Sequence, residues 1–404
     1  MEGSIHGPLH GVKVLELGTL IAAPFASRLF AEFGAEVIKV EDPKTGDPIR
    51  NWRYLHEGTS LWWYVQSRNK RSIALNLKDP RAQEVARQLA READIVVENY
   101  RPGVLEKWGL GYEQLRAANP ATVMVRISGY GQTGPMRDRP GFGAIAESMG
   151  GIRFVTGYPD RPPVRIGISI GDSIAALHAV VGALMALRHR DMTGGRGKGE
   201  GQMVDVALYE AVFNLMESTL PEYDRYGVVR ERTGTNLTGI VPSNTYPTAD
   251  GRHIVIGGNG DSIFKRLMRA IGRPDLADDP SLSNNAGRAG RAQELDDAIA
   301  AWTSRQTLEH ALDEMSRAEV PSGKIYSAAD MVDDPQFTAR AMIERVALPD
   351  GTPLAIPAVV PKLSRTPGGT RWLGPGLGEH TDEVLAELGF DEDRIRKLRA
   401  DRII

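Results

Sequence analysis

The sequence predicts an α/β protein built around a parallel β-sheet. One observation supports the parallel sheet, and a second concerns the number of domains. In residues 1–130, continuous runs of Val, Ile and Leu alternate with longer segments whose apolar residues recur at helical spacing. Strands with such unbroken apolar runs are buried on both faces, as in a parallel sheet covered by helices. The chain also has 404 residues, which is long enough for two or more domains.

The expected elements follow one another from the N-terminal end. Segment 24–34 is predicted to be a helix that ends at Gly34, and segment 79–93 is predicted to be a helix because its apolar residues have helical periodicity. The predicted strands of this region lie at residues 11–18, 35–41, 71–77, 94–100 and 122–131.

The stretch GISIGDSIAALHAVVGALMALRHR, residues 167–190, contains a helix that is expected to begin at Asp172 and is apolar on nearly all sides. A helix of this kind is buried, either inside a domain or at a subunit contact. A polar, glycine-rich loop follows at 191–201, and then a further strand and helix.

A domain boundary is expected where the periodic signal fades. Residues 222–250 are rich in Gly, Thr, Asn and Pro, which is typical of a linker. A smaller unit follows and is expected to end near residues 324–334. Its predicted elements are a strand at 252–258 and helices near 261–272, 291–303 and 306–318, and the tail carries a predicted helix at 378–390.

Composition excludes several classes of function. The net charge of −3 gives no extended basic surface for nucleic acid. The absence of cysteine excludes disulfides, thiolate metal sites and a cysteine nucleophile. The N-terminal residues lack the pattern of a signal peptide. No uninterrupted apolar run reaches the roughly 18–20 residues of a membrane span, because His178 breaks the closest one. A cytoplasmic protein without a membrane segment is expected.

Two glycine-rich motifs match nucleotide-binding loops only in part. GYGQTG, residues 129–134, follows a strand, but Pro135 and polar residues come next instead of the helix that a dinucleotide site needs. GGRGKGEG, residues 194–201, lacks the Ser or Thr that follows the lysine of a phosphate loop. Histidines do not occur at metal-ligand spacing, so no metal site is expected.

Two polar features each have two interpretations. RNKRS, residues 68–72, is either a solvated loop or a clamp for a phosphate-bearing ligand. Asp172 is either a helix N-cap, for which Asp is favoured, or a carboxylate nucleophile. The nucleophile is supported by Gly167 and Gly171, which permit a ligand to approach the backbone closely. It is also supported by the helix N-terminus, which keeps a carboxylate anionic.

Several motifs in consistent order resemble those of the class III CoA-transferase family, of the CaiB/BaiF type. They are LxGVKVLEL near the start, FGAEVIKVE (33–41), RNKRSIALNLK (68–78), ADIVVENYRPG (93–103), GYGQTGP, GDS with its apolar helix, the TGGRG loop and LGEHTDEVLAELG (377–389). The resemblance covers essentially the whole chain. The family includes formyl-CoA transferase, carnitine CoA-transferase and dicarboxylate CoA-transferases, with alpha-methylacyl-CoA racemase as a relative.

The resemblance implies an architecture of two domains in an interlocked homodimer. The large domain has a Rossmann-like parallel sheet that binds CoA, and the smaller domain is α+β. The implied boundaries are 1–222 for the first part of the large domain, 223–250 for a linker, 251–330 for the small domain, and 331–404 for a linker and the C-terminal return to the large domain.

The resemblance also implies a reaction. Asp172 attacks the thioester of an acyl-CoA donor and forms a mixed anhydride, the released CoA converts this to an aspartyl-CoA thioester, and an acceptor carboxylate then receives CoA. The coenzyme A thioester is a substrate, and no cofactor is bound permanently. Water must be excluded from both intermediates. The implied lid is the loop of Gly257, Gly258, Asn259 and Gly260, whose N–H groups are expected to face the acyl oxygen.

CoA contacts follow from the resemblance, one position at a time. They are Ile21, Ala22, Leu75, Asn76, Leu77, Lys78, Asn99, Tyr100, Arg101, Lys107, Arg139 and Phe142. Three positions depart from the family pattern. Asp42 stands where formyl-CoA transferase has an Arg that faces the nucleotide, so the RNKR segment is expected to supply charge. Phe142 replaces the catalytic His of the racemase, which argues against proton exchange at the α-carbon. Gly143 replaces a residue that is commonly acidic in the transferases.

The pattern is closer to bacterial dicarboxylate transferases than to oxalate enzymes. It predicts succinyl-CoA as donor and itaconate, malate, citramalate or a similar diacid as acceptor. The candidates for binding the second carboxylate are Arg50, Arg53, Arg165 and Arg230. The alternatives are an acyl-CoA racemase or dehydratase, a formyl-CoA:oxalate or carnitine-type transferase, and a non-catalytic CoA-binding protein.

Overall fold

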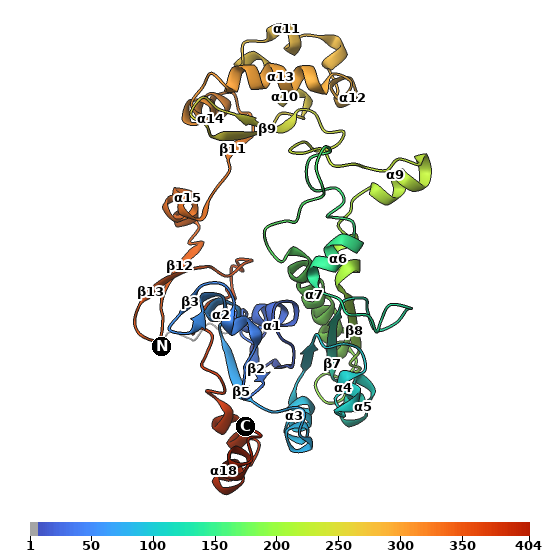
Figure 1. Cartoon of the computed structure of the whole chain (residues 1–404), viewed down its shortest axis with the longest axis vertical. Coiled ribbons are helices and arrows are strands. Elements are labelled where there is room, and N and C mark those ends of the chain that lie inside the picture. The colour runs from blue at the N-terminus through green and yellow to red at the C-terminus, as the bar shows by residue number, and fades with distance from the viewer. Residues whose placement is uncertain (1–6) are drawn as a thin grey trace. The chain divides into compact units, whose positions relative to one another are not determined.

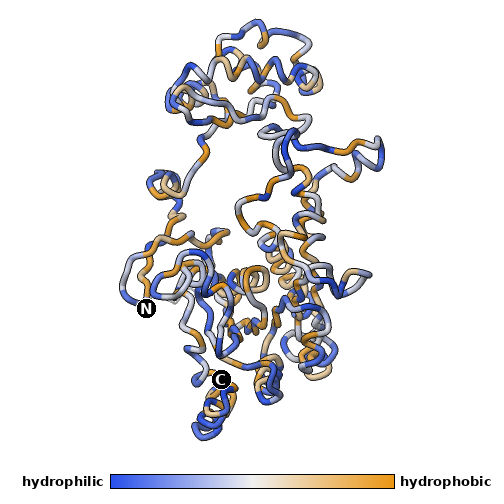
Figure 2. The backbone as a smooth tube through the Cα atoms, viewed as in Figure 1, coloured by the Kyte–Doolittle hydropathy of each residue, from blue (hydrophilic) through white to orange (hydrophobic). Residues whose placement is uncertain are grey.

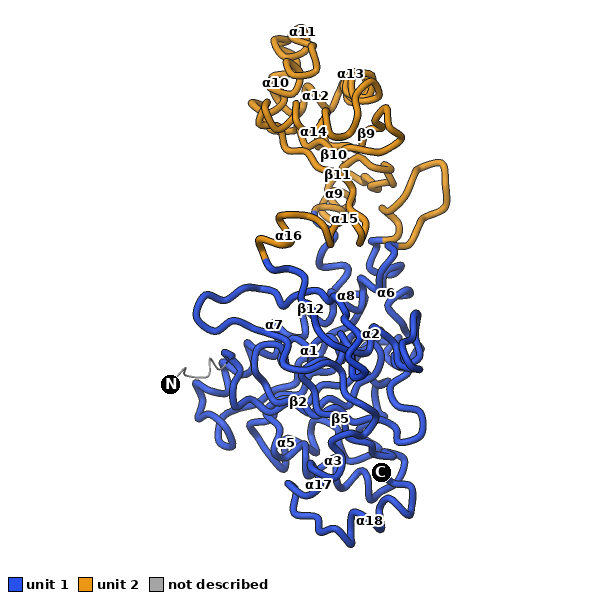
Figure 3. Tube along the Cα trace, turned by 90° about the vertical axis from the view of Figure 1, so that its left-hand side faces the viewer, with its two compact units in different colours: residues 1–152, 166–217, 341–404 blue, residues 153–165, 218–340 orange. Residues whose placement is uncertain are grey.

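The computed structural model describes residues 7–404 and divides the chain into two compact units (Figure 3). Unit 1 comprises Met1–Ile152, Ile166–Glu217 and Ala341–Ile404, and unit 2 comprises Arg153–Arg165 and Ser218–Arg340. The chain therefore leaves unit 1 and returns to it twice. The short excursion at 153–165 has no counterpart in the sequence pattern.

A six-stranded sheet forms the centre of unit 1, and each neighbouring pair of its strands is parallel. This confirms the predicted α/β class. The strands are β1 (Lys13–Glu16), β2 (Glu36–Glu41), β5 (Lys70–Ala74), β6 (Ile95–Glu98), β7 (Val123–Ser128) and β8 (Met203–Ala207). Their order in space is β5-β2-β1-β6-β7-β8, which is the strand order of a Rossmann fold. The direction of winding reverses between β1 and β6, and ligands of such sheets bind outside the strand ends at that point.

Helices and short hairpins surround this sheet in unit 1. The helices are α1 (Ala22–Glu32), η1 (Pro48–Asn51), α2 (Leu61–Gln66), α3 (Pro80–Glu92), α4 (Val104–Lys107), α5 (Tyr112–Ala118), α6 (Gly143–Met149), α7 (Ile170–Met192), α8 (Leu208–Phe213), α17 (Thr381–Glu387) and α18 (Glu392–Ala400). The hairpins are formed by β3 (Leu55–His56) with β4 (Thr59–Ser60), and by β12 (Ile343–Ala347) with β13 (Pro353–Pro357). Figure 1 shows β2 and β5 in blue near α1, and α18 in red at the C-terminal end.

Alternate strand residues face two separate cores because successive side chains of a strand point to opposite faces of the sheet. Val14, Ile95 and Val125 pack with α1 and α7. Leu15 and Val96 pack on the other face with α3, α17 and α18. Both faces are therefore covered, which explains why the strands are rich in Val, Ile and Leu. Figure 2 shows α18, at the C-terminal end, as mainly hydrophilic.

Helix α7 lies against α1, α8 and strands β7 and β8. It has 23 residues, and by length and composition alone it could cross a membrane, with 44% of its apolar window buried. The helix is longer than the apolar run counted in the sequence because His178 does not interrupt it. The apolar residues on its buried side are explained by its packing against β7, β8, α1 and α8.

Unit 2 contains a three-stranded antiparallel sheet in the order β11-β10-β9. Its strands are β9 (Ser243–Pro247), β10 (His253–Gly257) and β11 (Ser322–Lys324). Its helices are α9 (Thr219–Tyr226), α10 (Asp261–Ala270), α11 (Pro274–Ala277), η2 (Pro280–Leu282), α12 (Asn285–Ala289), α13 (Ala292–Thr303), α14 (Leu308–Arg317), α15 (Ala328–Asp333) and α16 (Pro335–Ala339). Ile254, Ile256 and Phe264 are central to its core.

Candidate active site

Asp172 lies in the first turn of α7, but it does not cap the helix. The helix begins at Ile170 after Ser169, so Asp172 is the third helical residue. The N-cap interpretation of Asp172 is therefore wrong. A carboxylate in the first helical turn is still stabilised as an anion by the helix dipole, and this residue is only half-buried. Both properties suit a nucleophile that must meet a substrate.

The start of α6 is packed against this carboxylate. A Cβ atom added at Gly143 would lie 2.1 Å from the Asp172 Oδ2 atom and 2.8 Å from its Cγ atom. No side chain fits there while Asp172 keeps its position. The Gly143 position, which is commonly acidic in transferases of this type, thus holds a glycine that makes room for the carboxylate. Phe142 immediately precedes it and is 68% exposed.

The two glycines before Asp172 play different parts. A Cβ atom at Gly171 would lie 3.2 Å from the Gly143 carbonyl oxygen and 3.2 Å from Glu147 Cγ, so α6 fills this space. The interpretation that Gly171 makes room for a ligand is wrong, because it makes room for α6. A Cβ atom at Gly167 would meet no atom within 4 Å.

The switch point of the sheet joins two predicted CoA-binding segments. Asn99, directly after β6, accepts a hydrogen bond from the Thr19 N–H at 2.9 Å and donates one to the Thr19 carbonyl at 2.8 Å. These bonds hold the turn that leads into α1. Ile21 and Ala22 form the start of α1 and are buried. The geometry therefore brings Ile21, Ala22 and Asn99 to the carboxyl ends of β1 and β6.

Five further predicted CoA positions line a cavity of about 160 Å³ beside this turn. They are Leu75, Asn76, Leu77, Lys78 and Tyr100. Asp42, which the sequence analysis singled out as a departure from the family pattern, also lines the wall. Residues of the wall that the sequence interpretation missed are Thr19, Val40, Glu41, Gly46, Asp47 and Trp108. The ring of Trp108 meets that of Tyr100 edge-on, with centroids 5.3 Å apart. No sequence motif marks Trp108, because it lies ten residues beyond β6 and reaches the cavity only through α4.

The remaining predicted CoA positions lie outside this wall. Arg101 follows β6 and Lys107 ends α4, and both are exposed. Arg139 is exposed in the segment between β7 and α6, and Phe142 adjoins the start of α6. Arg101 and Lys107 are therefore close in sequence to the lining residues Tyr100 and Trp108, but the structure does not gather all predicted contacts around one cavity.

The RNKR segment is not a phosphate clamp. Arg68 is buried against Glu32, and Lys70 is buried 2.7 Å from Glu16. Arg71 pairs with carboxylates of three residues: Glu36, Glu383 and Glu387. Each cation is thus used inside unit 1, and the expectation that this segment supplies charge to the nucleotide is wrong.

Glu16 stands at the centre of a buried polar network below the cavity. Its carboxylate accepts hydrogen bonds from Lys39 and Lys70, each at 2.7 Å, and from Ser27. Burial alone would raise the pKa of Glu16, but the two ammonium groups outweigh it and lower the pKa to about 2. Lys39 also lies 2.8 Å from Asp47, which lines the cavity. The network ties β1, β2 and β5 together and reaches the cavity wall through Asp47.

Asp42 has a structural role at the cavity wall. Its carboxylate accepts hydrogen bonds from the N–H groups of Lys44 and Thr45 at 2.9 and 3.0 Å. Burial opposes ionisation, but these donors and the ammonium of Lys78 lower the pKa of Asp42. The residue therefore fixes the turn after β2 as an anion, in contrast to the Arg of formyl-CoA transferase at this position.

One of the candidate arginines for a substrate carboxylate is already engaged. Arg50 is buried, donates to both oxygens of Glu41 at 2.7 and 2.8 Å, and stacks 3.5 Å above the Trp63 ring. Its assignment to a substrate is wrong for this reason. Arg53 is exposed above the ring of Trp62. Arg165 and Arg230 belong to unit 2.

The glycine-rich loop in unit 2 follows β10. The N–H groups of Gly257 and Gly258 donate to the carbonyls of Pro321 and Pro242, each at 2.9 Å. They do not face an acyl oxygen as expected. Among the described residues, nothing accepts a hydrogen bond from the N–H groups of Asn259 and Gly260. A Cβ atom at Gly258 would lie 2.5 Å from Leu267, so close packing requires this glycine.

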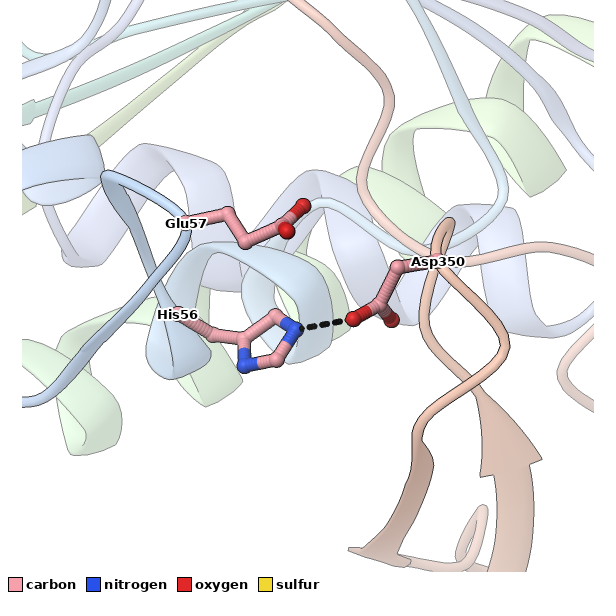
Figure 4. Close-up of side chains that lie close together, drawn as sticks. All are labelled: His56, Glu57 and Asp350. Carbon is pink, nitrogen blue, oxygen red and sulfur yellow. Dashed lines mark hydrogen bonds and ion pairs between the residues drawn. The ribbon is translucent and has the colours of Figure 1, made fainter.

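Within residues 7–404, one cluster has the donor types of a metal site. His56, Glu57 and Asp350 each offer a ligand atom, and these atoms lie within 4.8 Å of one another (Figure 4). His56 Nε2 lies 2.9 Å from Asp350. The same carboxylate accepts hydrogen bonds from the backbone N–H and hydroxyl of Thr352. This arrangement fastens the β3–β4 hairpin to the turn between β12 and β13.

The whole chain also compares closely with known proteins. A model of CoA-transferase family III matches residues 9–381. The chain belongs to CoA-transferase family III. It is 52% identical over 399 residues to succinyl-CoA–D-citramalate CoA-transferase of Chloroflexus aurantiacus, covering 98% of each chain. It is 42% identical to the beta subunit of succinyl-CoA–L-malate CoA-transferase of the same organism, again over 98% of each chain. The predicted family and the predicted enzyme class, a CoA-transferase, are confirmed.

A solved structure of the same family has the same fold. The CAIB/BAIF family protein from Brucella suis superposes with a TM-score of 0.81 at 33% identity, over 95% of this chain and 100% of that one. This CoA-transferase family III enzyme therefore uses an acyl-CoA thioester and a carboxylic acid. Asp172 beside Gly143 and the cavity at the switch point both lie in unit 1.

Proposed function

We propose that this CoA-transferase moves CoA from succinyl-CoA to a short dicarboxylic acid of the citramalate or malate type. The observation that carries the proposal is the half-buried Asp172 carboxylate in the first turn of α7, with Gly143 leaving room for it. The names of two relatives that match over nearly their full length, a D-citramalate and an L-malate transferase, support the choice of acids.

The proposed reaction proceeds through two covalent intermediates on Asp172. A carboxylate oxygen attacks the thioester carbonyl, the C–S bond breaks, and CoA thiolate leaves a mixed succinyl-aspartyl anhydride. The thiolate attacks the aspartyl carbonyl and expels succinate, which leaves an aspartyl-CoA thioester. The acceptor carboxylate displaces the thiolate to give a second anhydride. The thiolate then attacks the acceptor acyl carbon, which regenerates Asp172. No net proton is consumed, and no bond energy is lost to water.

The residues around the switch point are proposed to hold the nucleotide part of CoA. The cavity lined by Leu75, Lys78 and Tyr100 has both apolar and charged side chains in its wall, and its edge-on aromatic pair suits a flat base. The exposed cations Arg101 and Lys107 are proposed to meet the phosphates. CoA is a substrate in this proposal, and no permanently bound cofactor is proposed.

A homodimer is also proposed. The outward side of α7 carries an apolar stripe at helical spacing, formed by Leu177, Val181, Leu184 and Met185, which are 41–67% exposed. A second copy of the chain is the proposed cover for it, because such stripes mark interfaces. The proposed location is the cytoplasm. A solution mass near the 44.1 kDa of one chain would contradict the dimer.

The test of the proposed function is an acceptor panel with succinyl-CoA as donor. We expect product acyl-CoA with citramalate, malate or itaconate, and none with the Asp172→Asn variant. Activity with monocarboxylates alone would contradict the dicarboxylate proposal. Deuterium entering the α-carbon of an acyl-CoA without any acceptor would instead indicate a racemase.

A further inference from the structure

Leu20, in the turn between β1 and α1, has a backbone conformation that is unusual for a residue with a side chain. Its φ angle is +67°, in the left-handed region. A Cβ atom disfavours this region by a factor of roughly 10, so such a residue stays there only when its surroundings hold it. Residues held in this way cluster at functional sites. This turn lies at the switch point of the sheet, where Thr19 lines the cavity.

Asp47 holds the backbone of Leu20 in this conformation. The Leu20 N–H donates to both oxygens of the Asp47 carboxylate, at 3.0 Å to Oδ1 and 3.1 Å to Oδ2. Hydrogen bonds to a charged acceptor are stronger than those between neutral groups. The carboxylate also accepts from the Ile49 N–H at 3.0 Å, and the Asp47 N–H donates to Glu41 at 2.9 Å. Asp47 is buried, so its carboxylate meets Leu20 from a fixed position.

The buried ammonium of Lys39 supports this carboxylate and the turn together. Its Nζ atom lies 2.8 Å from Asp47 and 2.7 Å from Glu16. It also donates to the carbonyl of Gly18 at 3.0 Å, so each of its three N–H bonds has an acceptor. Burial alone would lower the pKa of Lys39, but neighbouring carboxylates, with Asp47 the strongest, raise it. Lys39 is therefore a cation, and it stabilises Asp47 as an anion.

Other side chains hold the neighbouring peptides of the turn. Asn99 accepts from the Thr19 N–H and donates to the Thr19 carbonyl. Gln66 donates to the Ile21 carbonyl at 3.1 Å. Within residues 7–404, the Leu20 N–H has no acceptor other than Asp47. Loss of this carboxylate would therefore release one peptide of a turn that is otherwise fixed.

We propose that Asp47 is a positioning residue for acyl-CoA binding, whose carboxylate holds the Leu20 peptide in the left-handed conformation and so shapes the cavity wall at Thr19. This inference rests on the proposed function, in which the cavity receives the nucleotide part of CoA. Asp47 itself lines the same cavity. Without the carboxylate, the turn would exchange with the conformations that Leu20 prefers. Only the fraction of molecules that keeps the cavity would then bind CoA.

The experiment is a double-mutant cycle on the full-length enzyme, with Asp47→Asn, Leu20→Gly and the double variant. Asparagine keeps the shape of Asp47 but replaces one carboxylate oxygen with an NH₂ donor, so the charged pair of acceptors is lost. Glycine populates positive φ about as readily as negative φ, so Leu20→Gly permits the left-handed turn without a carboxylate. The quantities compared are the Kd of free CoA by isothermal titration calorimetry, and KM and kcat with succinyl-CoA.

We expect Asp47→Asn alone to raise the Kd of CoA about 10-fold, which is the factor by which the left-handed conformation is disfavoured. KM for succinyl-CoA should rise in parallel, while kcat stays within about two-fold, because a binding interaction is lost. In the Leu20→Gly background, the same substitution should raise the Kd by no more than about two-fold. If Asp47 served only as the partner of Lys39, a change at Leu20 would not relieve its loss.

Glu319→Gly is the matched control. Glu319 also has a positive φ, of +53°, but it belongs to unit 2. Relief of its backbone strain should leave the Kd of CoA within about two-fold of the wild-type value. Asp47→Asn should keep its effect of about 10-fold in this background. A rescue by Glu319→Gly as complete as that by Leu20→Gly would indicate a general gain in stability and would overturn the inference.

Two results of the cycle itself also overturn the inference. One is an unchanged Kd in Asp47→Asn, and the other is an equal effect of Asp47→Asn with and without Leu20→Gly. If Asp47→Asn does not fold, Leu20→Ile decides the case, because a β-branched side chain of the same size is tolerated still less at positive φ. Its Kd for CoA should rise at least about three-fold, and a smaller rise overturns the inference.

Failure of the proposed function would look different. It would be visible in the wild-type enzyme and in Trp108→Ala. If the wild type transfers no CoA, or if Trp108→Ala leaves KM for succinyl-CoA unchanged, the cavity is not the nucleotide site and the inference falls with it. If the wild type transfers CoA and Trp108→Ala raises KM, but Asp47 and Leu20 show no coupling, only the role of Asp47 is refuted.

Discussion

Replacement of Gly143 by alanine tests how closely the Asp172 carboxylate must be placed. The new Cβ atom would lie 2.1 Å from Asp172 Oδ2, whereas real Cβ atoms essentially never approach another heavy atom closer than 3.0 Å. The carboxylate must therefore move by about 1 Å. A displacement of about 1 Å in a reacting group lowers the rate roughly 100-fold, which corresponds to about 2.7 kcal/mol of activation free energy. Gly143 begins α6 without a positive φ, so alanine does not strain the backbone.

The assay is the initial rate of CoA transfer from succinyl-CoA to citramalate, with hydroxylamine trapping as a second readout. We expect kcat of Gly143→Ala to fall about 100-fold, and trapping on Asp172 to fall with it, while the Tm changes little. Gly167→Ala is the control, because a Cβ atom there meets nothing within 4 Å, and it should retain wild-type rates. A Gly143→Ala enzyme with at least about half the wild-type kcat would refute the reasoning, since the clash would then have no chemical consequence.

Three further predictions concern the cavity, the buried network and the path of oxygen. Trp108→Ala removes one wall of the cavity and should raise KM for succinyl-CoA about 10-fold with kcat nearly unchanged. An unchanged KM would mean that the nucleotide base of CoA binds outside this cavity. Glu16 has a pKa lowered to about 2, so its stabilisation is present above its unfolded pKa and is lost as the pH falls toward 2. Glu16→Gln should therefore lower the free energy of unfolding at pH 7, measured by urea titration, by about 3 kcal/mol. The free energy of unfolding of the variant should also depend less on pH below 4.5. A variant whose free energy of unfolding falls with pH as steeply as that of the wild type would contradict this. In the proposed reaction each acceptor leaves one carboxylate oxygen on Asp172. Citramalate labelled with ¹⁸O in its carboxylates should therefore pass label into succinate over repeated turnovers, as measured by mass spectrometry. Succinate that stays unlabelled would exclude the second anhydride.

The sheet was predictable because its physical cause is local in the sequence. Strands buried on both faces are rich in apolar residues, so β1, β2, β6 and β7 stand out by their Val, Ile and Leu, although Lys39 interrupts β2 and Arg126 interrupts β7. The short β9 and β11 were missed because the sequence SNTYP has no apolar run and SGK has no side chain that marks a strand. Pairing with β10 makes them strands, and that pairing is a contact over long sequence distance.

The position of the candidate nucleophile could be predicted because a sequence motif marks it. The roles of residues that depend on packing against distant segments could not be predicted. The GDS element located Asp172, but the sequence placed the helix start two residues late, because Ile170 and Gly171 are not typical first-turn residues. The cations of RNKR looked available, since nothing in the sequence shows that Glu16 and Glu32 lie beside them in the fold. Partners separated by tens of residues become neighbours only through the sheet order.

The clearance at Gly143 could not have been seen in the sequence either. Glycine there has several ordinary explanations, and only the distance to the Asp172 carboxylate selects one. Arg288 is a similar case, because it occurs in a polar stretch and its guanidinium is satisfied in part by the carbonyls of two distant residues, Val241 and Asn259.

The most direct test of the account is to identify the group that carries the acyl intermediate. Intact-protein mass spectrometry after mixing with succinyl-CoA, followed by hydroxylamine treatment and peptide mapping, reports this group. We expect a hydroxamate on Asp172 in the wild-type enzyme and none in Asp172→Asn. CoA transfer that proceeds without a hydroxamate on Asp172, or with one on another carboxylate, would contradict the assignment of the helix mouth as the active site.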